Sequence, residues 1–169
     1  MTREWEDGEA PRPRSVASPK IALRTTALGR GVFATEAIAA GELLIAVAHV
    51  FVAEAGQYTI QLDDDRHQAG TGEIDDFLNH ACEPNAALDA ERLCFVAVRP
   101  LASGDEVTFN YLTSEWDMAA AFECRCGAER CFGTIRGYRH LSREQQDSLA
   151  AAITPFLRRK RASGLPSAA

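Results

Sequence analysis

The stretch "NHACEPN", residues 79–85, brings an amide, an imidazole, a thiol and a second amide together within seven positions. Asn and Pro are ordinary turn residues, so a polar loop of this kind needs no function. A thiol beside an imidazole can also bind a metal ion. Which interpretation holds depends on what the rest of the chain can place next to Cys82 and His80.

A second cluster of thiols occurs later in the chain, in "CRCGAERC", residues 124–131. A structural zinc site needs four tetrahedral ligands, and this segment supplies only three. The fourth ligand could be Cys82, Cys94 or a histidine. Cys94 lies within an apolar run, "LCFVAV", whereas Cys82 lies in a polar loop. We therefore predict a zinc site formed by Cys82, Cys124, Cys126 and Cys131. The alternative is a loop of unligated thiols.

Strand patterns surround these motifs. In "EVTFNY", residues 106–111, Val107, Phe109 and Tyr111 fall on one face of a strand. The stretch 57–62 has the same alternation, with Tyr58 on the face of Ile60 and Leu62 and with Gln61 on the other. Residues 93–98 predict a strand that is buried on both faces, and residues 21–54 predict short strands joined by turns.

Helical patterns are short. Residues 74–78 predict one short helix that delivers Asn79 and His80. Ser142 begins a capping box, and apolar residues then recur at helical spacing as far as Leu157. Pro155 should break or kink this helix. The basic run at 158–161 is either a solvated helix end or an anion or targeting patch, and the acids at 63–65 predict a solvated turn.

Composition limits the possible functions. The chain has 169 residues and is 46% hydrophobic, as expected for one domain with tails. Its 18 basic and 24 acidic residues give a net charge of −6, which argues against a basic nucleic-acid-binding face and is compatible with a cationic partner. No apolar stretch is long enough to span a bilayer or to form a signal peptide. We expect a cytoplasmic monomer, with the nucleus as the alternative compartment.

Five motifs together resemble one family. Their order and spacing are similar to those of the SET-domain protein lysine methyltransferases, and the resemblance covers residues 21–137. They are "GRGVFA" at 29–34, "YTIQLD" at 58–63, "FLNHACEPN" at 77–85, "GDEVTFNY" at 104–111 and "CRCGAERC" at 124–131. The resemblance implies a mainly β fold with short helices, in which small curved sheets form a β-clip-like SET domain with a pseudoknot. A C-terminal zinc knuckle and helix follow.

Composition, helical spacing and the resemblance together predict boundaries within the chain. We expect a disordered leader at 1–19, a SET domain at 20–120 and a post-SET zinc-binding segment at 121–137. A helical segment at 138–161 and a flexible tail at 162–169 complete the chain. Asp76, Ala81 and Asn110 depart from the residues that are frequent at those positions in the family.

The implied activity is methyl transfer from S-adenosyl-L-methionine to a lysine ε-amine of a basic protein, with structural Zn²⁺. By resemblance, the fourth zinc cysteine matches Cys82. The catalytic positions match Tyr111, Tyr58 and Phe109. The cofactor-binding positions match Gly29, Arg30, Gly31, Asn79, His80 and Tyr111. Neither a nucleic acid nor a membrane is expected as a direct partner.

The chemistry suits these residue types. A lysine amine with a pKa of about 10.4 must become neutral before it attacks, and burial in an aromatic channel favours the neutral form without a strong base. Tyr111 should orient the reacting groups, because a phenol with a pKa near 10 is seldom ionised at neutral pH. Phe109 at the family's Phe/Tyr switch position predicts di- or trimethylation. The alternative is a non-catalytic, zinc-stabilised module that binds a protein tail.

Overall fold

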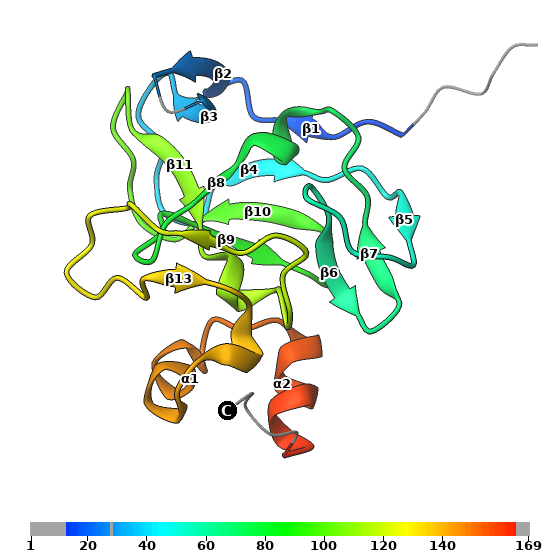
Figure 1. Cartoon of the computed structure of the whole chain (residues 1–169). Helices are drawn as coiled ribbons and strands as arrows, with labels where there is room; N and C mark the ends of the chain where they lie inside the picture. Colours follow the sequence, from blue (N-terminus) through cyan, green and yellow to red (C-terminus); the bar gives the residue numbers. More distant parts are fainter. Residues whose placement is uncertain (1–12, 28, 165–169) are drawn as a thin grey trace, which may run out of the picture.

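The computed structural model describes residues 13–27 and 29–164, and this part of the chain is mainly β (Figure 1). The predicted leader and tail therefore lie partly outside the described residues. The strands are β1 (Val16–Ala17), β2 (Ile21–Thr26), β3 (Gly29–Ala34), β4 (Leu43–Ala46), β5 (Phe51–Val52), β6 (Ile60–Asp63), β7 (Arg66–Gln68), β8 (Asn79–His80), β9 (Ala86–Asp89), β10 (Cys94–Ala97), β11 (Glu106–Phe109), β12 (Phe122–Glu123) and β13 (Thr134–Ile135).

These strands form small sheets rather than one large sheet, which confirms the predicted fold class. One sheet has the order β1-β4-β10-β9 and a second has the order β2-β3-β11-β8. β5-β7-β6 and β12-β13 form two smaller sheets. The main core lies between the sheets and includes Val32, Ile45, Phe95 and Val107, all fully buried. β1 lies inside the predicted leader, so regular structure begins before residue 20.

The segment 79–85 and the segment 106–111 are interlocked. β8 pairs in parallel with β11, so that Asn79 and His80 lie opposite Thr108 and Phe109. The side chain of Asn85 donates to the Glu106 carbonyl at 2.8 Å and accepts from the Thr108 amide at 2.9 Å. These bonds satisfy backbone groups that a short parallel pair leaves unpaired. The interlocking is the arrangement that the resemblance implied.

The strand predicted around Tyr58 begins later than expected. β6 starts at Ile60, and Tyr58 lies before it with 52% of its surface exposed. Ile60 and Gln61, on opposite faces of the predicted alternation, are both buried, and an irregularity in the β6-β7 pairing lies between Gln61 and Asp63. Gln61 is buried because it makes hydrogen bonds to a distant segment, described below.

The two α-helices are short and lie at the end of the molecule opposite β2 and β3 (Figure 1). The 3-10 turn η1 (Ile74–Phe77) precedes Asn79, as predicted, and Ser142 with Gln145 forms a capping box. The remaining elements are η2 (Tyr111–Thr113), η3 (Tyr138–His140), α1 (Arg143–Leu149) and α2 (Pro155–Ala162). As predicted, Pro155 breaks the helical pattern, which forms two helices rather than one kinked helix. It starts α2, with Thr154 as the N-cap, because proline at the first helical turn costs no hydrogen bond.

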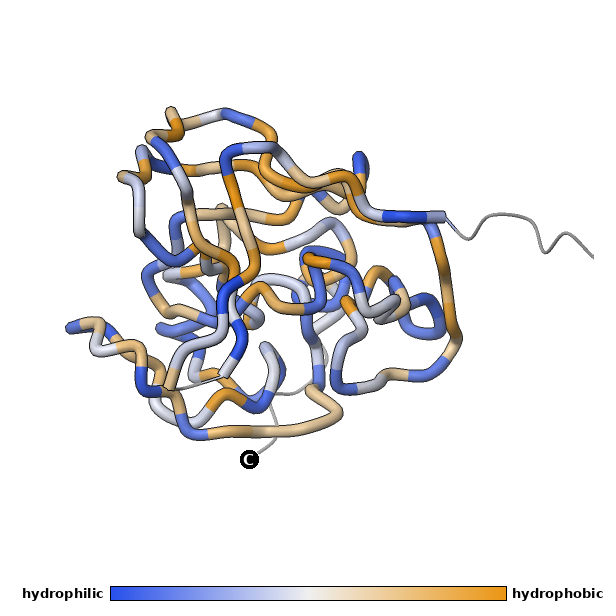
Figure 2. The backbone as a smooth tube through the Cα atoms, turned by 90° about the horizontal axis from the view of Figure 1, so that it is seen from above, coloured by the Kyte–Doolittle hydropathy of each residue, from blue (hydrophilic) through white to orange (hydrophobic). Residues whose placement is uncertain are grey.

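The basic run at 158–161 lies on α2 and is paired with acids. Arg159 contacts Asp63 at 2.7 Å, Lys160 contacts Asp64, and Arg161 contacts Asp147. The acidic turn between β6 and β7 therefore holds α2. Figure 2 shows that hydrophobic and hydrophilic stretches alternate along the backbone. Among the described residues, none of the helices has the length and hydrophobicity needed to span a bilayer.

Candidate functional site

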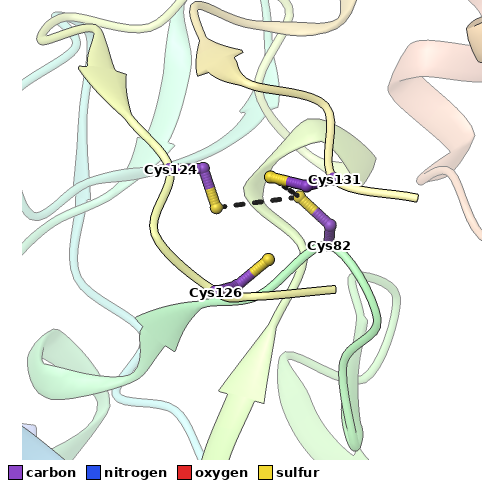
Figure 3. Close-up of side chains that lie close together, drawn as sticks. All are labelled: Cys82, Cys124, Cys126 and Cys131. Carbon is purple, nitrogen blue, oxygen red and sulfur yellow. Dashed lines mark hydrogen bonds between the residues drawn. The ribbon is translucent and has the colours of Figure 1, made fainter. Parts of the chain in front are cut away.

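Four thiols converge beside the interlocked segments (Figure 3). The Sγ atoms of Cys82, Cys124, Cys126 and Cys131 all lie within 4.8 Å of one another. Sγ of Cys82 lies 3.7 Å from that of Cys124 and 3.8 Å from that of Cys131. A tetrahedral zinc ion with Zn–S bonds of about 2.3 Å holds its sulfurs about 3.8 Å apart. The donor set and its spacing therefore fit zinc. Cys94 is buried in β10, outside this cluster.

Hydrogen bonds around Cys82 suit a metal-bound thiolate. The amide of Phe132 donates to its Sγ at 3.3 Å. The His80 ring is neutral because burial lowers its pKa to about 4. Its Nδ1 accepts from the Tyr111 amide at 3.2 Å, so its hydrogen is on Nε2, which lies 3.4 Å from Sγ of Cys82. Such donors orient and stabilise a zinc ligand. His80 thus links the cysteine cluster to Tyr111.

A large groove runs beside this cluster. Its volume is about 820 Å³, which is within the range of small-molecule sites. Tyr58, Phe109 and Tyr111 line it, as do Arg30, Asn79 and His80. The structure therefore brings most of the predicted site residues to one groove. Gly29 and Gly31 lie next to it in β3, on either side of Arg30.

Tyr111 lies at the centre of the aromatic part of the groove. Its hydroxyl donates to the Leu78 carbonyl at 2.7 Å. Burial raises the pKa of this phenol well above its usual value, and the negative charges of Glu115 and Glu106 raise it further. Tyr111 is therefore a neutral phenol whose hydrogen is committed to Leu78. Its oxygen can accept a hydrogen bond from a group in the groove.

Aromatic rings surround Tyr111. The ring centroids of Phe109 and Tyr111 are 4.7 Å apart, and Phe109 packs in turn on Phe95 at 4.9 Å. Phe122 lies edge-on to Tyr111 at 6.0 Å and to His80 at 5.7 Å. This apolar wall disfavours a charged ammonium group beside Tyr111. Tyr58 lines the same groove but lies near its surface, 6.4 Å from the ring of Phe77.

Asn79 organises the other part of the groove. Its amide nitrogen donates to the Arg30 carbonyl at 3.0 Å and to the Glu106 carboxylate at 2.7 Å. Within the described chain both contacts use the nitrogen, so the amide oxygen is available to a ligand. A Cβ on Gly31 would lie only 2.6 Å from Glu106 Oε1. Glycine at this position therefore permits the Glu106–Asn79 contact.

Several residues in and beside the groove suit S-adenosylmethionine. Gly29 has φ +118°, and among the described residues no atom beyond its chain neighbours lies within 4 Å of where its Cβ would be, so its backbone is open to approach. The Arg30 guanidinium lies 3.7 Å from the Phe77 ring centroid and lines the groove. A large groove with an exposed amide and an open glycine backbone suits a polar nucleoside ligand. The residues present fit the cofactor.

Four residues that shape the groove were not predicted from the sequence. Glu106 positions Asn79, and Phe122 packs on Tyr111. Gln61 and Glu115 join β6 to the segment after Tyr111 through a 2.9 Å hydrogen bond. Glu106 and Phe122 lie inside or beside the quoted motifs and could have been noted. The Gln61–Glu115 contact spans 54 positions and leaves no local signal.

Comparisons with known proteins agree with this geometry. The family described as SET domain matches residues 29–112. Methyltransferase flvH of Aspergillus flavus is 41% identical over 63 residues, which cover 36% of this chain and 35% of that protein. Histone-lysine N-methyltransferase Su(var)3-9 of Drosophila pseudoobscura pseudoobscura is 32% identical over 81 residues, 37% of this chain and 13% of that one. The chain thus spans about a third or less of these relatives.

A solved structure has the same fold. The crystal structure of KRYPTONITE in complex with mCHG DNA and SAH matches with a TM-score of 0.52 and 21% identity. The match covers 68% of this chain and 28% of that one. The chain is a SET-domain protein related to histone-lysine methyltransferases, with a C-terminal four-cysteine cluster consistent with a post-SET zinc site.

Proposed function

We propose that this protein is an S-adenosylmethionine-dependent protein-lysine N-methyltransferase. The observation that carries the proposal is the position of the Tyr111 phenol. It lies in an aromatic groove, bonded to Leu78, next to the Asn79 and Arg30 surface that suits the cofactor. A module that only binds a protein tail would not need both the aromatic part of the groove and the part around Asn79 and Arg30.

S-adenosylmethionine, when bound, supplies an electrophilic methyl group on a positively charged sulfur. We assign the cofactor to Gly29, Arg30, Gly31, Asn79, His80 and Tyr111. The crystal structure of KRYPTONITE, which has the same fold, contains SAH and supports this assignment. The ring of His80 is already bonded to protein, so its contribution would come from backbone and packing.

The residues of this chain supply orientation and a low dielectric. Phe109 and Tyr111 form an apolar wall that favours the neutral target amine over the ammonium ion. The Tyr111 oxygen and the Leu78 carbonyl present two acceptors that hold the amine hydrogens and direct the lone pair. Tyr111 does not remove a proton, because its raised pKa keeps the phenol neutral.

We further propose that the product is di- or trimethyllysine. Phe109 carries no hydroxyl that could hold a water molecule or a partly methylated amine beside Tyr111. Tyr58, on the exposed edge of the groove, would contact the stem of the target lysine. We expect a basic protein substrate, a structural zinc ion at the four cysteines, and a monomer in the cytoplasm with the nucleus as the alternative.

Two experiments test this proposal. Calorimetry should detect binding of S-adenosylhomocysteine to the purified protein. Incubation with labelled S-adenosylmethionine and a whole-cell extract, followed by mass spectrometry, should identify a modified lysine. Absence of both cofactor binding and labelling would favour the non-catalytic module instead.

A further inference from the structure

Glu115 is a buried acid in the wall of the groove. Only 8% of its surface is exposed, yet it lines the groove together with Tyr111 and Ile60. Its amide donates to the Tyr111 carbonyl at 2.9 Å, so it lies one helical turn beyond that tyrosine. Neither the cysteine cluster nor the Asn79 contacts use it. A buried carboxyl group facing a ligand groove is costly to keep, which suggests a role for it.

The carboxyl group is fixed in position by one of its two oxygens. Oε1 accepts from the Gln61 amide at 2.9 Å and from the Ser114 hydroxyl at 2.9 Å. The Gln61 side chain accepts in turn from the Trp116 amide at 2.8 Å, which holds both segments in register. Oε2 has no hydrogen-bond partner among the described residues. One oxygen therefore fixes the group, and the other remains able to accept a proton.

The Glu115 carboxyl group can gain or lose a proton near neutral pH. Burial raises the pKa of Glu115 to about 7, against the opposing effect of the hydrogen bonds from Gln61 and Ser114. The ionised form acts on Tyr111, whose pKa it raises after the larger effect of burial. Other ionisable groups lie on the elements packed around Glu115. They are Tyr111, Tyr138, His67, Asp63 and, on α2, Arg159 and Lys160.

The other candidate bases near Tyr111 already make hydrogen bonds within the protein. Nδ1 of His80 accepts from the Tyr111 amide, and the pKa of this ring is lowered to about 4 by burial. The Tyr111 hydroxyl donates to Leu78. Glu106 accepts from Asn79 through its Oε1. Glu115 differs from Glu106 and from the buried Asp75, which also line the groove, because it lies one helical turn from Tyr111 and its Oε1 is fixed by Gln61 and Ser114.

Resting on the proposed methyl transfer, we propose that Glu115 is the catalytic residue that takes the proton from the target lysine, directly or through one water molecule. An N–H bond of the ammonium breaks and an O–H bond forms on Oε2, and the electron pair stays on nitrogen. That pair then forms the N–C bond, while the C–S bond breaks and its electrons remain on sulfur. The carboxyl group releases its proton to solvent after turnover.

The test compares Glu115→Gln with the unmodified protein, using a synthetic peptide that spans the lysine identified in the extract experiment. Glutamine keeps an oxygen acceptor for the Gln61 amide, so the fold and zinc content should persist. In the unmodified protein, kcat should rise with pH through about 7, because only the carboxylate accepts a proton. Glu115→Gln should lower kcat roughly 10²-fold and remove this inflection, with little change in KM.

Ser114→Ala is the matched variant. The Ser114 hydroxyl lowers the pKa of Glu115, so its removal should move the inflection to higher pH while turnover at high pH stays near normal. A purely structural role for Glu115 predicts loss of stability in both variants without any shift of the inflection. An inflection unchanged in folded Glu115→Gln would overturn the proposal.

Binding gives a second measurement. With S-adenosylhomocysteine present, the lysine peptide should bind more tightly at pH 8 than at pH 6, and its norleucine analogue should bind equally at both. Glu115→Gln should remove the difference. If the unmodified protein transfers no methyl group at all, the proposed function fails and this inference fails with it. If it transfers methyl groups and both variants keep the normal pH profile, only the inference about Glu115 fails.

Discussion

The Tyr111 hydroxyl and the Leu78 carbonyl are joined by a hydrogen bond of 2.7 Å. Leu78 immediately precedes β8, and Tyr111 begins η2 immediately after Asn110, beyond the end of β11. The bond therefore fixes the phenol relative to the interlocked segments. It also places two oxygen atoms side by side at the apolar wall of the groove.

Tyr111→Phe tests how much this hydrogen bond and the hydroxyl contribute to stability and turnover. The change keeps the ring but leaves the Leu78 carbonyl without its donor, which should lower the free energy of unfolding by about 1–3 kcal/mol. Turnover should fall roughly 10²-fold or more, because one preorganised polar group is lost from the reacting centre. Near-normal turnover by the folded variant would exclude the proposed role.

Cys82→Ser tests the metal site, with Cys94→Ser as its control. Because Cys82 contributes one of four converging thiols, its loss should reduce zinc content well below one ion per chain and should destabilise the protein. Cys94 lies in β10 outside the cluster, so its replacement should leave zinc content unchanged. Elemental analysis and thermal denaturation measure both effects. The reverse pattern would show that the ligand assignment is wrong.

Phe109→Tyr tests the number of methyl groups added. The new hydroxyl would lie beside Tyr111, where it can hold a water molecule or the amine and hinder rotation of a methylated amine. The product should shift toward monomethyllysine with less effect on the first transfer. Mass spectrometry after long incubation measures the ratio. If the unmodified protein accumulates only monomethyllysine, Phe109 does not have this role.

Gly31→Ala tests the cofactor side of the groove. The added Cβ would displace the flexible end of Glu106 and so disturb its contact with Asn79. Binding of S-adenosylhomocysteine should weaken about tenfold or more, a loss of about 1.4 kcal/mol, while overall stability changes little. Gly56→Ala is the matched change at another glycine of the groove, since its Cβ would meet only Thr59 at 3.5 Å. Calorimetry should show unchanged cofactor affinity for that variant.

Lys160→Ala tests the contact between α2 and the β6-β7 turn. The Lys160 side chain is 17% exposed, pairs with Asp64 and lies 5.4 Å from the Phe156 ring centroid. Its removal should lower the free energy of unfolding by about 1 kcal/mol, through lost packing as well as lost charge. Arg158→Ala on the same helix removes an exposed side chain and should change stability by less than about 0.5 kcal/mol. Urea denaturation distinguishes the two variants.

Local sequence patterns predicted much of the fold. The period of two across Val107 and Phe109 predicted β11, and the Ser142–Gln145 capping box predicted the start of α1. The spacing of three thiols, together with a fourth in a polar loop, predicted the cysteine cluster. These signals are short-range, because strand alternation, helix capping and knuckle spacing are set by neighbouring residues.

Tertiary structure alone decided the rest. The burial of Gln61 and Glu115 depends on a hydrogen bond across 54 positions, and the pairing of Lys160 with Asp64 spans a still longer separation. Such contacts depend on how separate sheets dock, which no local period encodes. The amino-acid sequence by itself determined which chemical groups the groove could contain. Only the folded chain decided that Glu115 would be buried, because its burial needs β6 packed against the segment after β11.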